Sequence, residues 1–492
     1  MSDPGRFALR RRLRACIATA VVALLAAGCG GKGIDTAPTS SDPGSIHSND
    51  CSPAQLNAAV LNTAREWYLF PELLPASIDP AAYGSVDDFV DQLTAQARAA
   101  GRDRFFSSTT RISVENQLLQ GQTVGFGFTL LERGAPAGVD VGQVFADSPA
   151  ADAGLARGDT LLAIGTSAAT LLPIEQVLAA PGGLEEAIGP STAGMVRALR
   201  WRTPAGIERV ASLTKRGFTL DAVPQESVRV LTSPAGTPVG HLTFRSFVTD
   251  PIANGQAADL AALRAAFAQF RAAGVRDLIV DLRYNGGGLV TIASLLLDLL
   301  AGDRAGQVAF ESRHNARQSA RNETTRLALQ PQTVPALRVA FVVTERSASA
   351  SELVINAMLP YARTAIIGTR TFGKPVGQLA FDVAACDFRL RLVAFRSVNR
   401  DGDGDYYEGL PDEAFARAGG AACAAIDDLS HLPGDPLEQM TATALAWIDS
   451  PTGQCGTDAI AATAGLRLKP RPPPASPVAA REALRDYLPG TF

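Results

Sequence analysis

The middle of the chain contains a mostly apolar run that ends in three glycines: Leu278-Ile279-Val280-Asp281-Leu282-Arg283-Tyr284-Asn285-Gly286-Gly287-Gly288. A short run of this kind, without the alternation of a half-exposed strand, is typical of a strand buried on both faces in a parallel sheet. The glycines predict a tight turn, and the apolar residues at 289–300 predict a helix after it. This unit indicates a parallel α/β domain, in which ligands and catalysts gather at the carboxyl ends of the strands.

The same alternation continues on both sides of this run. Strands are expected at 239–244, 339–343, 365–367 and 388–395, and helices at 257–273 and 351–361. Such alternation is typical of parallel-sheet units, so we predict one α/β domain over 217–450. Upstream, apolar residues recur at helical spacing from Leu56 to Ala64, and a second helix is expected at 86–100. These patterns indicate a helical N-terminal domain over 51–120.

Residues 121–216 have the short strands and turns of a small β domain. Strands are expected at 124–130, 139–145, 160–164 and 195–202. The first is entered through a glycine loop, and a segment rich in Ala and Gly follows at 147–159. The two features together resemble a PDZ domain, whose glycine loop offers N–H groups to the terminal carboxylate of a peptide; alone, the loop could be a tight turn. The resemblance implies a PDZ-like peptide-binding domain over 121–216, with its loop at Gly125, Phe126, Gly127 and Phe128.

Length and composition limit the class of protein. The 492 residues suffice for about three domains with large buried cores. Hydrophobic residues at 46% and charged residues at 19% exclude a disordered chain. The net charge of −4 gives no electrostatic basis for binding nucleic acid. Only four of the 45 basic residues are lysines, at 32, 215, 374 and 469, so a lysine at 374 calls for a chemical reason.

The first 50 residues have the pattern of an export signal and a tether. Arginines at 10–14 precede an apolar stretch at 15–27, which is too short to span a bilayer but suits a signal peptide over 1–28. The stretch ends Leu25-Ala26-Ala27-Gly28-Cys29, which resembles the lipobox of bacterial lipoproteins and implies lipidation at Cys29. Plain secretion is the alternative. Residues 29–50 are expected to be a flexible tether, and 451–492 a C-terminal tail.

Four further cysteines remain after the signal peptide and Cys29: Cys51, Cys386, Cys423 and Cys455. An even number in an exported protein permits disulfides, and three pairings are possible. We favour Cys386–Cys423 with Cys51–Cys455. The chain has no CxxC motif, so nothing indicates a structural zinc site or a thioredoxin-type centre.

The segment 368–378 contains the first candidate for chemistry. Gly368 to Lys374 matches the start of a phosphate-binding P-loop, but Pro375 stands where a Ser or Thr should bind magnesium. Nucleotide binding is therefore disfavoured. Lys374 could be an ordinary exposed lysine. Because a lysine can lose its proton when desolvated and an arginine cannot, Lys374 is also a candidate general base.

The second and third candidates are the segments 347–352 and 286–288. Ser349 and Glu352 have the spacing of a capping box, in which the serine only satisfies helix N–H groups. A serine at a helix N-terminus is alternatively a nucleophile whose oxyanion is favoured by the helix dipole. The three glycines could form a flexible turn, or could place a backbone donor against a substrate carbonyl.

Taken together, these segments resemble the carboxyl-terminal processing (tail-specific) proteases, serine peptidases with a Ser–Lys dyad and an embedded PDZ domain. In that family the middle serine of Ser-Ala-Ser-Ala-Ser-Glu is the nucleophile, and the lysine lies 25 positions further on in Thr-Phe-Gly-Lys. The resemblance implies Ser349 as nucleophile, Lys374 as base and Gln378 as the residue that orients the lysine. It implies backbone oxyanion donors at Ala350 and at Gly286 or Gly287.

The same resemblance implies a multidomain α/β fold, with a ClpP/crotonase-like catalytic core, and neither cofactor nor metal. It also implies exported protein substrates, recognised through their C-termini. The segments at 66–69 and 105–107 look like those of the lipoprotein branch of the family, which implies a lipid-anchored protein of the bacterial cell envelope, facing the periplasm or the exterior.

Three alternatives stay open. The PDZ-like and sheet domains could form a binding module or ligand carrier that does not cut. A Ser-His-Asp triad would need His241, His314 or His431, none of which lies beside a nucleophile motif, and no GxSxG elbow occurs. The acidic segment 401–405 resembles the opening of a calcium loop, but Tyr406 replaces the required glycine, which favours a solvated acidic turn.

Overall fold

The computed structural model describes residues 50–133, 138–250 and 260–455. The predicted signal peptide, Cys29, nearly all of the tether and most of the tail lie outside these residues. Within the described part of the chain, no helix is both long and apolar enough to cross a membrane.

A six-stranded sheet forms the centre of the domain that follows residue 220. In spatial order its strands are β10 (Arg229–Thr232), β11 (Pro238–Thr243), β12 (Asp277–Asp281), β15 (Arg338–Val343), β16 (Arg363–Gly368) and β19 (Ala421–Ala424). All neighbours pair in parallel except β10, which is antiparallel at the edge. The parallel sheet predicted from the run at 278–282 is confirmed, and β19 is a strand that the sequence pattern did not reveal.

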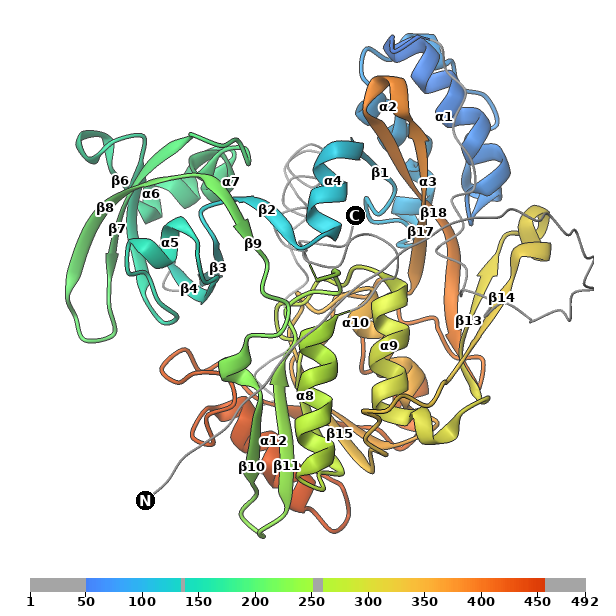
Figure 1. The fold of residues 1–492 in the computed structure, drawn as a ribbon. Helices are drawn as coiled ribbons and strands as arrows, with labels where there is room; N and C mark the ends of the chain where they lie inside the picture. The colour runs from blue at the N-terminus through green and yellow to red at the C-terminus, as the bar shows by residue number, and fades with distance from the viewer. Residues whose placement is uncertain (1–49, 134–137, 251–259, 456–492) are drawn as a thin grey trace, which may run out of the picture. The chain divides into compact units, whose positions relative to one another are not determined.

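Both faces of this sheet are covered by helices. Alternate residues of β12 point to opposite faces: Leu278 and Val280 join the core under three helices, while Ile279 joins the core under a fourth. The three helices are α8 (Ala261–Ala272), α9 (Val290–Ala301) and α10 (Ala350–Met358), and the fourth is α12 (Gln439–Asp449). Figure 1 shows α8 and α9 side by side across one face. Burial on both sides explains why the strand sequences are continuously apolar.

A second, antiparallel sheet carries the N-terminal helices. Its strands are β1 (Ser108–Arg111), β18 (Phe388–Asn399), β13 (Val308–His314), β14 (Glu323–Arg326) and β17 (Val376–Val383), the last paired to β18. The helices packed against it include α1 (Pro53–Trp67), α2 (Val86–Leu93) and α3 (Ala95–Ala99). The helix expected at 86–100 is thus divided at Thr94. Because β17 begins two residues after Lys374, this sheet fixes the lysine segment.

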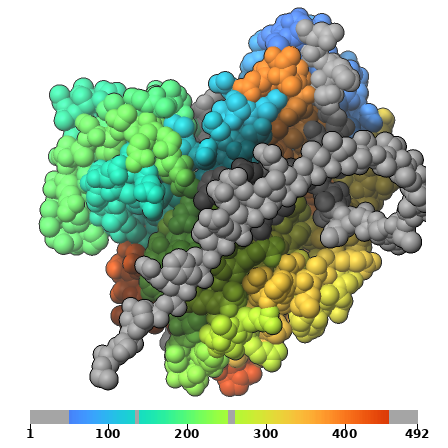
Figure 2. All heavy atoms as spheres, viewed as in Figure 1, coloured from blue at the N-terminus to red at the C-terminus, as the bar shows by residue number. Residues whose placement is uncertain are grey.

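Residues 122–219 form the predicted β domain, which is PDZ-like. Its sheet has the order β3 (Phe128–Arg133), β4 (Gly138–Val144), β5 (Thr160–Gly165), β7 (Val196–Arg202) and β8 (Glu208–Thr214), so β3 is an edge strand. At the ends of the domain, β2 (Gln122–Gly125) pairs with β9 (Arg216–Thr219). The single strand expected at 124–130 is wrong, because the chain breaks at Phe126 and Gly127, where the glycine has φ +84°. In the space-filling view the atoms of this sheet form one packed body (Figure 2).

The disulfides differ from the predicted pairing. The structure joins Cys51 to Cys386 and Cys423 to Cys455, with Cα–Cα distances of 5.6 and 5.3 Å. Cys386 lies in the short turn between β17 and β18, and α1, which begins two residues after Cys51, contacts β18. Cys423 lies instead in β19 of the central sheet, beside the segment after α12. Sequence spacing could not show that the two cysteines of the predicted pair belong to different sheets.

Candidate active site

Three neighbouring strands of the central sheet lead into the three candidate segments. The order β12-β15-β16 is parallel, so the glycine segment after β12, the serine segment after β15 and the lysine segment after β16 begin at the same edge. Side chains tie these segments together. Ser347 Oγ donates to the Leu282 carbonyl at 2.6 Å, and Ser351 Oγ donates to the Asn285 carbonyl at 2.8 Å. The two outer serine hydroxyls therefore bind the segment that follows β12, whereas Ser349 forms the capping box of α10 with Glu352.

Ser349 occupies a strained backbone conformation at the N-terminus of α10. Its φ is +55° and its ψ −113°, a region that non-glycine residues avoid and that costs of order 1–3 kcal/mol. The glycine segment lies directly against it: a Cβ added to Gly287 would come within 2.9 Å of Ser349 Cβ and 3.0 Å of Ala350 N. The glycine is required by this close approach, which brings the predicted oxyanion segment to the predicted nucleophile.

Lys374 is buried, with 3% of its surface exposed. Its Nζ donates to Gln378 Oε1 at 2.7 Å, the partner expected from the sequence. Burial lowers the pKa of Lys374 to about 7; Asp103 and Glu352 act in the opposite direction, and Arg391 adds to the lowering. Near neutral pH a substantial fraction of this amine is unprotonated, which is the state that a general base requires.

Glu352 connects the serine and lysine segments. Its Oε2 accepts the backbone N–H groups of Ser349 at 2.9 Å and Lys374 at 2.8 Å, so one oxygen holds both chains side by side. Its Oε1 accepts from Gly373 N at 2.7 Å and from Thr371 Oγ1 at 2.5 Å. Burial raises the pKa of Glu352, and these hydrogen bonds oppose that rise. The sequence predicted only its capping role; the bonds to the lysine segment were missed.

Two of the predicted oxyanion donors remain candidates. The Gly287 N–H donates to Asn285 Oδ1 at 2.9 Å, so this amide is already engaged. Asn285 is itself fixed, because its Nδ2 donates to the Phe244 carbonyl at 2.8 Å and its carbonyl accepts from Ala348 N at 3.1 Å. We therefore keep Gly286 and Ala350 as the backbone donors for an oxyanion.

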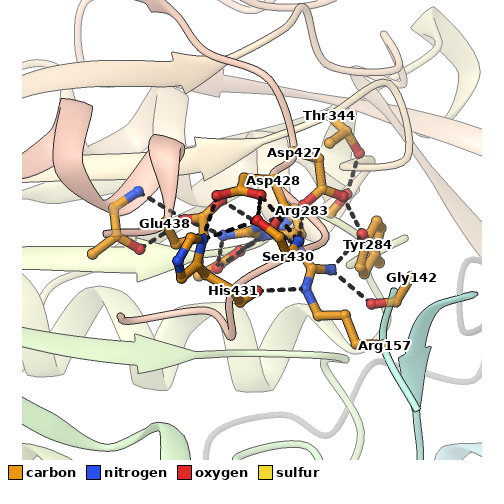
Figure 3. Close-up of polar contacts among 12 residues, drawn as sticks. Gly142, Arg157, Arg283, Tyr284, Thr344, Asp427, Asp428, Ser430, His431 and Glu438 are labelled. Atoms are coloured by element: carbon orange, nitrogen blue, oxygen red, sulfur yellow. Dashed lines mark hydrogen bonds and ion pairs between the residues drawn. The ribbon is translucent and has the colours of Figure 1, made fainter. Parts of the chain in front are cut away.

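A buried ionic network fixes the residues between β12 and the glycine turn (Figure 3). Arg283 pairs with Asp281 at 2.7 Å, Asp427 at 2.6 Å and Glu438 at 3.1 Å. Tyr284 donates its hydroxyl proton to Asp427 as well. Burial would raise the pKa of Asp427, but the guanidinium groups of Arg283 and Arg157 hold it below its usual value. The network was not predicted, because two of its carboxylates, Asp427 and Glu438, lie 144 and 155 residues beyond Arg283 in the sequence.

The PDZ-like domain contacts this network and the serine segment. Arg157 of the PDZ-like domain pairs with Asp427 and donates to the Tyr284 hydroxyl at 3.0 Å (Figure 3). Arg346, three residues before Ser349, donates to the Leu130 carbonyl of β3 at 2.8 Å. The PDZ-like domain is therefore bonded to both sides of the candidate site.

The predicted peptide loop of the PDZ-like domain packs closely against the second motif of that domain. Its Phe126 is buried and stacks on Phe128 with ring centroids 5.7 Å apart. Ser148 of the second motif lies so close to Gly127 that a Cβ there would overlap it, and Ala150 N donates to the Phe126 carbonyl at 2.8 Å. This packing explains why the two motifs occur together, with Gly125 and Phe128 at the strand ends on either side.

The alternative catalytic and metal residues are engaged elsewhere. His241 is buried against the Ser227 carbonyl at 2.9 Å, His314 packs edge-on to Trp67, and His431 pairs with Asp428 at 2.7 Å. Each carboxylate of the acidic turn pairs with its own arginine: Asp401 with Arg400, Asp403 with Arg417 and Asp405 with Arg396. Among the residues that the structure describes, no group of three potential metal ligands occurs.

Comparison with known proteins finds similarity to one family of serine peptidases. Residues 238–411 match the model of "Peptidase family S41", and residues 55–108 match "Peptidase S41 N-terminal domain". A "Probable CtpA-like serine protease" of Staphylococcus epidermidis is 25% identical over 54% of this chain and 47% of its own length. One of Staphylococcus saprophyticus is 30% identical over 24% of this chain and 23% of its own. The matched part of the chain thus spans about half the length of the Staphylococcus epidermidis protein and about a quarter of the Staphylococcus saprophyticus protein.

A solved structure shows the same fold. The "Putative S41 protease" of Bacteroides fragilis superposes with a TM-score of 0.59 at 24% identity, covering 79% of this chain and 96% of that one. At this level of identity the superposition supports the fold alone.

Proposed function

We propose that the chain is a member of peptidase family S41, whose model matches residues 238–411, and that it is a serine endopeptidase that cuts exported proteins with a Ser349–Lys374 dyad. The observation that carries the proposal is the state of Lys374. Its amine is buried, hydrogen-bonded to Gln378 and lowered in pKa to about 7, and its backbone shares one carboxylate oxygen with that of Ser349. A lysine placed only to carry charge would not need this environment.

The proposed reaction proceeds through an acyl-enzyme. Ser349 Oγ attacks the scissile carbonyl while neutral Lys374 takes the hydroxyl proton, and the N–H groups of Gly286 and Ala350 stabilise the oxyanion. The tetrahedral intermediate then expels the amine, which takes its proton from Lys374. Water, deprotonated by the same lysine, attacks the ester. Ser349 Oγ then leaves and takes that proton back from Lys374, which releases the carboxylic acid and returns the enzyme to its starting state.

The substrates are proposed to be recognised through their C-termini. The edge strand β3 can accept an added peptide strand, and the loop at 125–128 can receive a terminal carboxylate. The lipobox-like segment ending at Cys29 supports a lipid-anchored protein of the bacterial cell envelope. Both statements extend the family assignment and rest on these segments of the sequence.

The function can be tested with purified protein and peptides that end in apolar residues. We expect cleavage products by mass spectrometry, and none with Ser349→Ala. C-terminally amidated copies of the same peptides are expected to be cut more slowly, since they lack the terminal carboxylate. Peptide binding without products in wild-type protein would instead favour the tail-binding module.

The activity is expected to depend on pH through Lys374. The amine must be neutral to act, and its pKa is lowered to about 7, so kcat/KM should rise with pH through about 7 and then level off. The check is a pH–rate profile between pH 5 and 9 at constant ionic strength. A rate that is still rising steeply at pH 9, as a free lysine with a pKa of about 10 predicts, would contradict the assigned environment.

A further inference from the structure

A segment of the N-terminal region, Asp103–Ser107, lies against the lysine. The Lys374 Nζ is 5.3 Å from the centroid of the Phe106 ring, and the Phe106 carbonyl accepts a hydrogen bond from Gln378 Nε2. Gln378 Oε1 in turn accepts from Lys374 Nζ at 2.7 Å. Phe106 therefore touches the amine with its side chain and fixes the residue that orients the amine with its backbone. Its side chain is completely buried.

Arg104 of the same segment holds the backbone that precedes the lysine. Its Nη2 donates to the carbonyls of Phe372 and Gly373, each at 2.7 Å, and its guanidinium lies 4.6 Å from the Phe372 ring centroid. The Phe372 ring also contacts Phe106, with centroids 6.1 Å apart. One N-terminal loop therefore holds the lysine segment in two ways: Arg104 donates to two consecutive carbonyls, and Phe106 packs against Phe372.

The segment is strained and is held in this shape by one buried carboxylate. Phe105 has a φ of +65°, which is unfavourable for an aromatic residue. Asp103 accepts from Phe106 N at 2.7 Å, from Ser107 N at 3.0 Å and from Ser107 Oγ at 2.7 Å. It also accepts from the Tyr68 hydroxyl at 2.9 Å. Strain that the surroundings maintain so completely is typical of functional sites.

We propose that Asp103–Ser107 is a working part of the active site, with Phe106 as a positioning residue that shields the Lys374 amine from water and fixes Gln378. The inference deepens the proposed function and rests on Lys374 being its base. It gives the N-terminal region a role in the chemistry, although that region lies about 270 residues before the lysine in sequence.

The burial of Lys374 and the charged groups around it determine whether a change at Phe106 raises or lowers the pKa of the amine. Asp103 from the N-terminal segment and Glu352 from α10 favour the protonated amine, Arg391 from β18 disfavours it, and Arg104 lies on the neighbouring carbonyls. Burial is the largest influence and favours the neutral amine. Removing the Phe106 ring should therefore admit water to the Lys374 amine and raise its pKa.

Phe106→Ala is expected to shift the midpoint of the acidic limb of the kcat/KM profile to higher pH, by about 1 unit or more. Activity should be largely recovered at high pH, where the amine is neutral again. Phe106→Val, which leaves a smaller void, carries the same expectation if the alanine variant does not fold. Phe89→Ala is the matched control, because Phe89 is equally buried in the same apolar cluster. It should lower the thermal stability but leave the limb in place. Equal losses at every pH, with no movement of the limb, would overturn the proposal.

A direct titration separates this inference from the proposed function. The chain has only four lysines, so the ¹³Cε signal of Lys374 in lysine-labelled Ser349→Ala protein can be assigned by its absence in Lys374→Arg. We expect the midpoint of this signal to rise when Phe106→Ala is added. An unchanged midpoint refutes the shielding role even if the protein is a peptidase. A raised midpoint in a protein that cuts no peptide supports the shielding role and rejects the peptidase.

Discussion

Lys374→Arg is expected to lower kcat/KM for peptide cleavage by about 10²–10⁴-fold, the contribution typical of a general base. The substitution keeps a positive charge of similar reach, but a guanidinium stays protonated in proteins and cannot take the proton of Ser349. The loss should persist up to pH 9, because no accessible pH makes the arginine neutral. Rates of peptide cleavage from pH 6 to 9 measure both effects.

Lys215→Arg is the matched control for this substitution. Lys215 is also buried, but its Nζ donates to the carbonyls of Gly189 and Pro190 in the PDZ-like domain, hydrogen bonds that a guanidinium can also donate. The Lys215→Arg variant should keep the pH profile of the wild type. If Lys374→Arg cleaves peptides at the wild-type rate, the amine is not the base and the proposed mechanism is wrong.

The parts of the site that could be predicted are those encoded in single short segments. Ser349, Lys374 and the glycines at 286–288 each follow a strand whose apolar sequence is recognisable, and parallel strands bring their carboxyl ends to one edge. The helices α9 and α10 could be placed for the same reason, because each begins directly after such a segment.

The parts that could not be predicted depend on partners distant in sequence. Asp103 and Phe106 look like ordinary turn and core residues until the second sheet brings them to Lys374. Asp427 lies in an irregular loop with no local signal of its contact with Arg283. The strands β13, β14 and β17 were missed because β13 and β17 are only partly buried, β14 is mostly exposed, and all three lack the continuous apolar run that marks a central strand.

Glu352→Gln is the substitution with the second largest expected effect, a loss of about 10²-fold or more in kcat. Each carboxylate oxygen accepts two donors, Ser349 N and Lys374 N on one and Gly373 N and Thr371 Oγ1 on the other. Whichever way the amide turns, its NH₂ group faces two donors, and each unsatisfied buried group costs about 1–3 kcal/mol. The Thr371 hydroxyl can relieve only one of these contacts, because its second lone pair can accept from the amide while Gly373 N is still left without an acceptor.

The physical reason for a loss in kcat rather than in binding is the strain at Ser349. Its positive φ persists only while Glu352 holds its N–H, so the glutamine variant should let the serine relax away from the lysine. Thr371→Val is the comparison, since it removes one donor but leaves the carboxylate to bind both backbones. It should retain more activity than Glu352→Gln at similar thermal stability. Should Glu352→Gln raise KM and leave kcat unchanged, the carboxylate does not set the geometry of the dyad, and the strained serine must be held by the glycine segment alone.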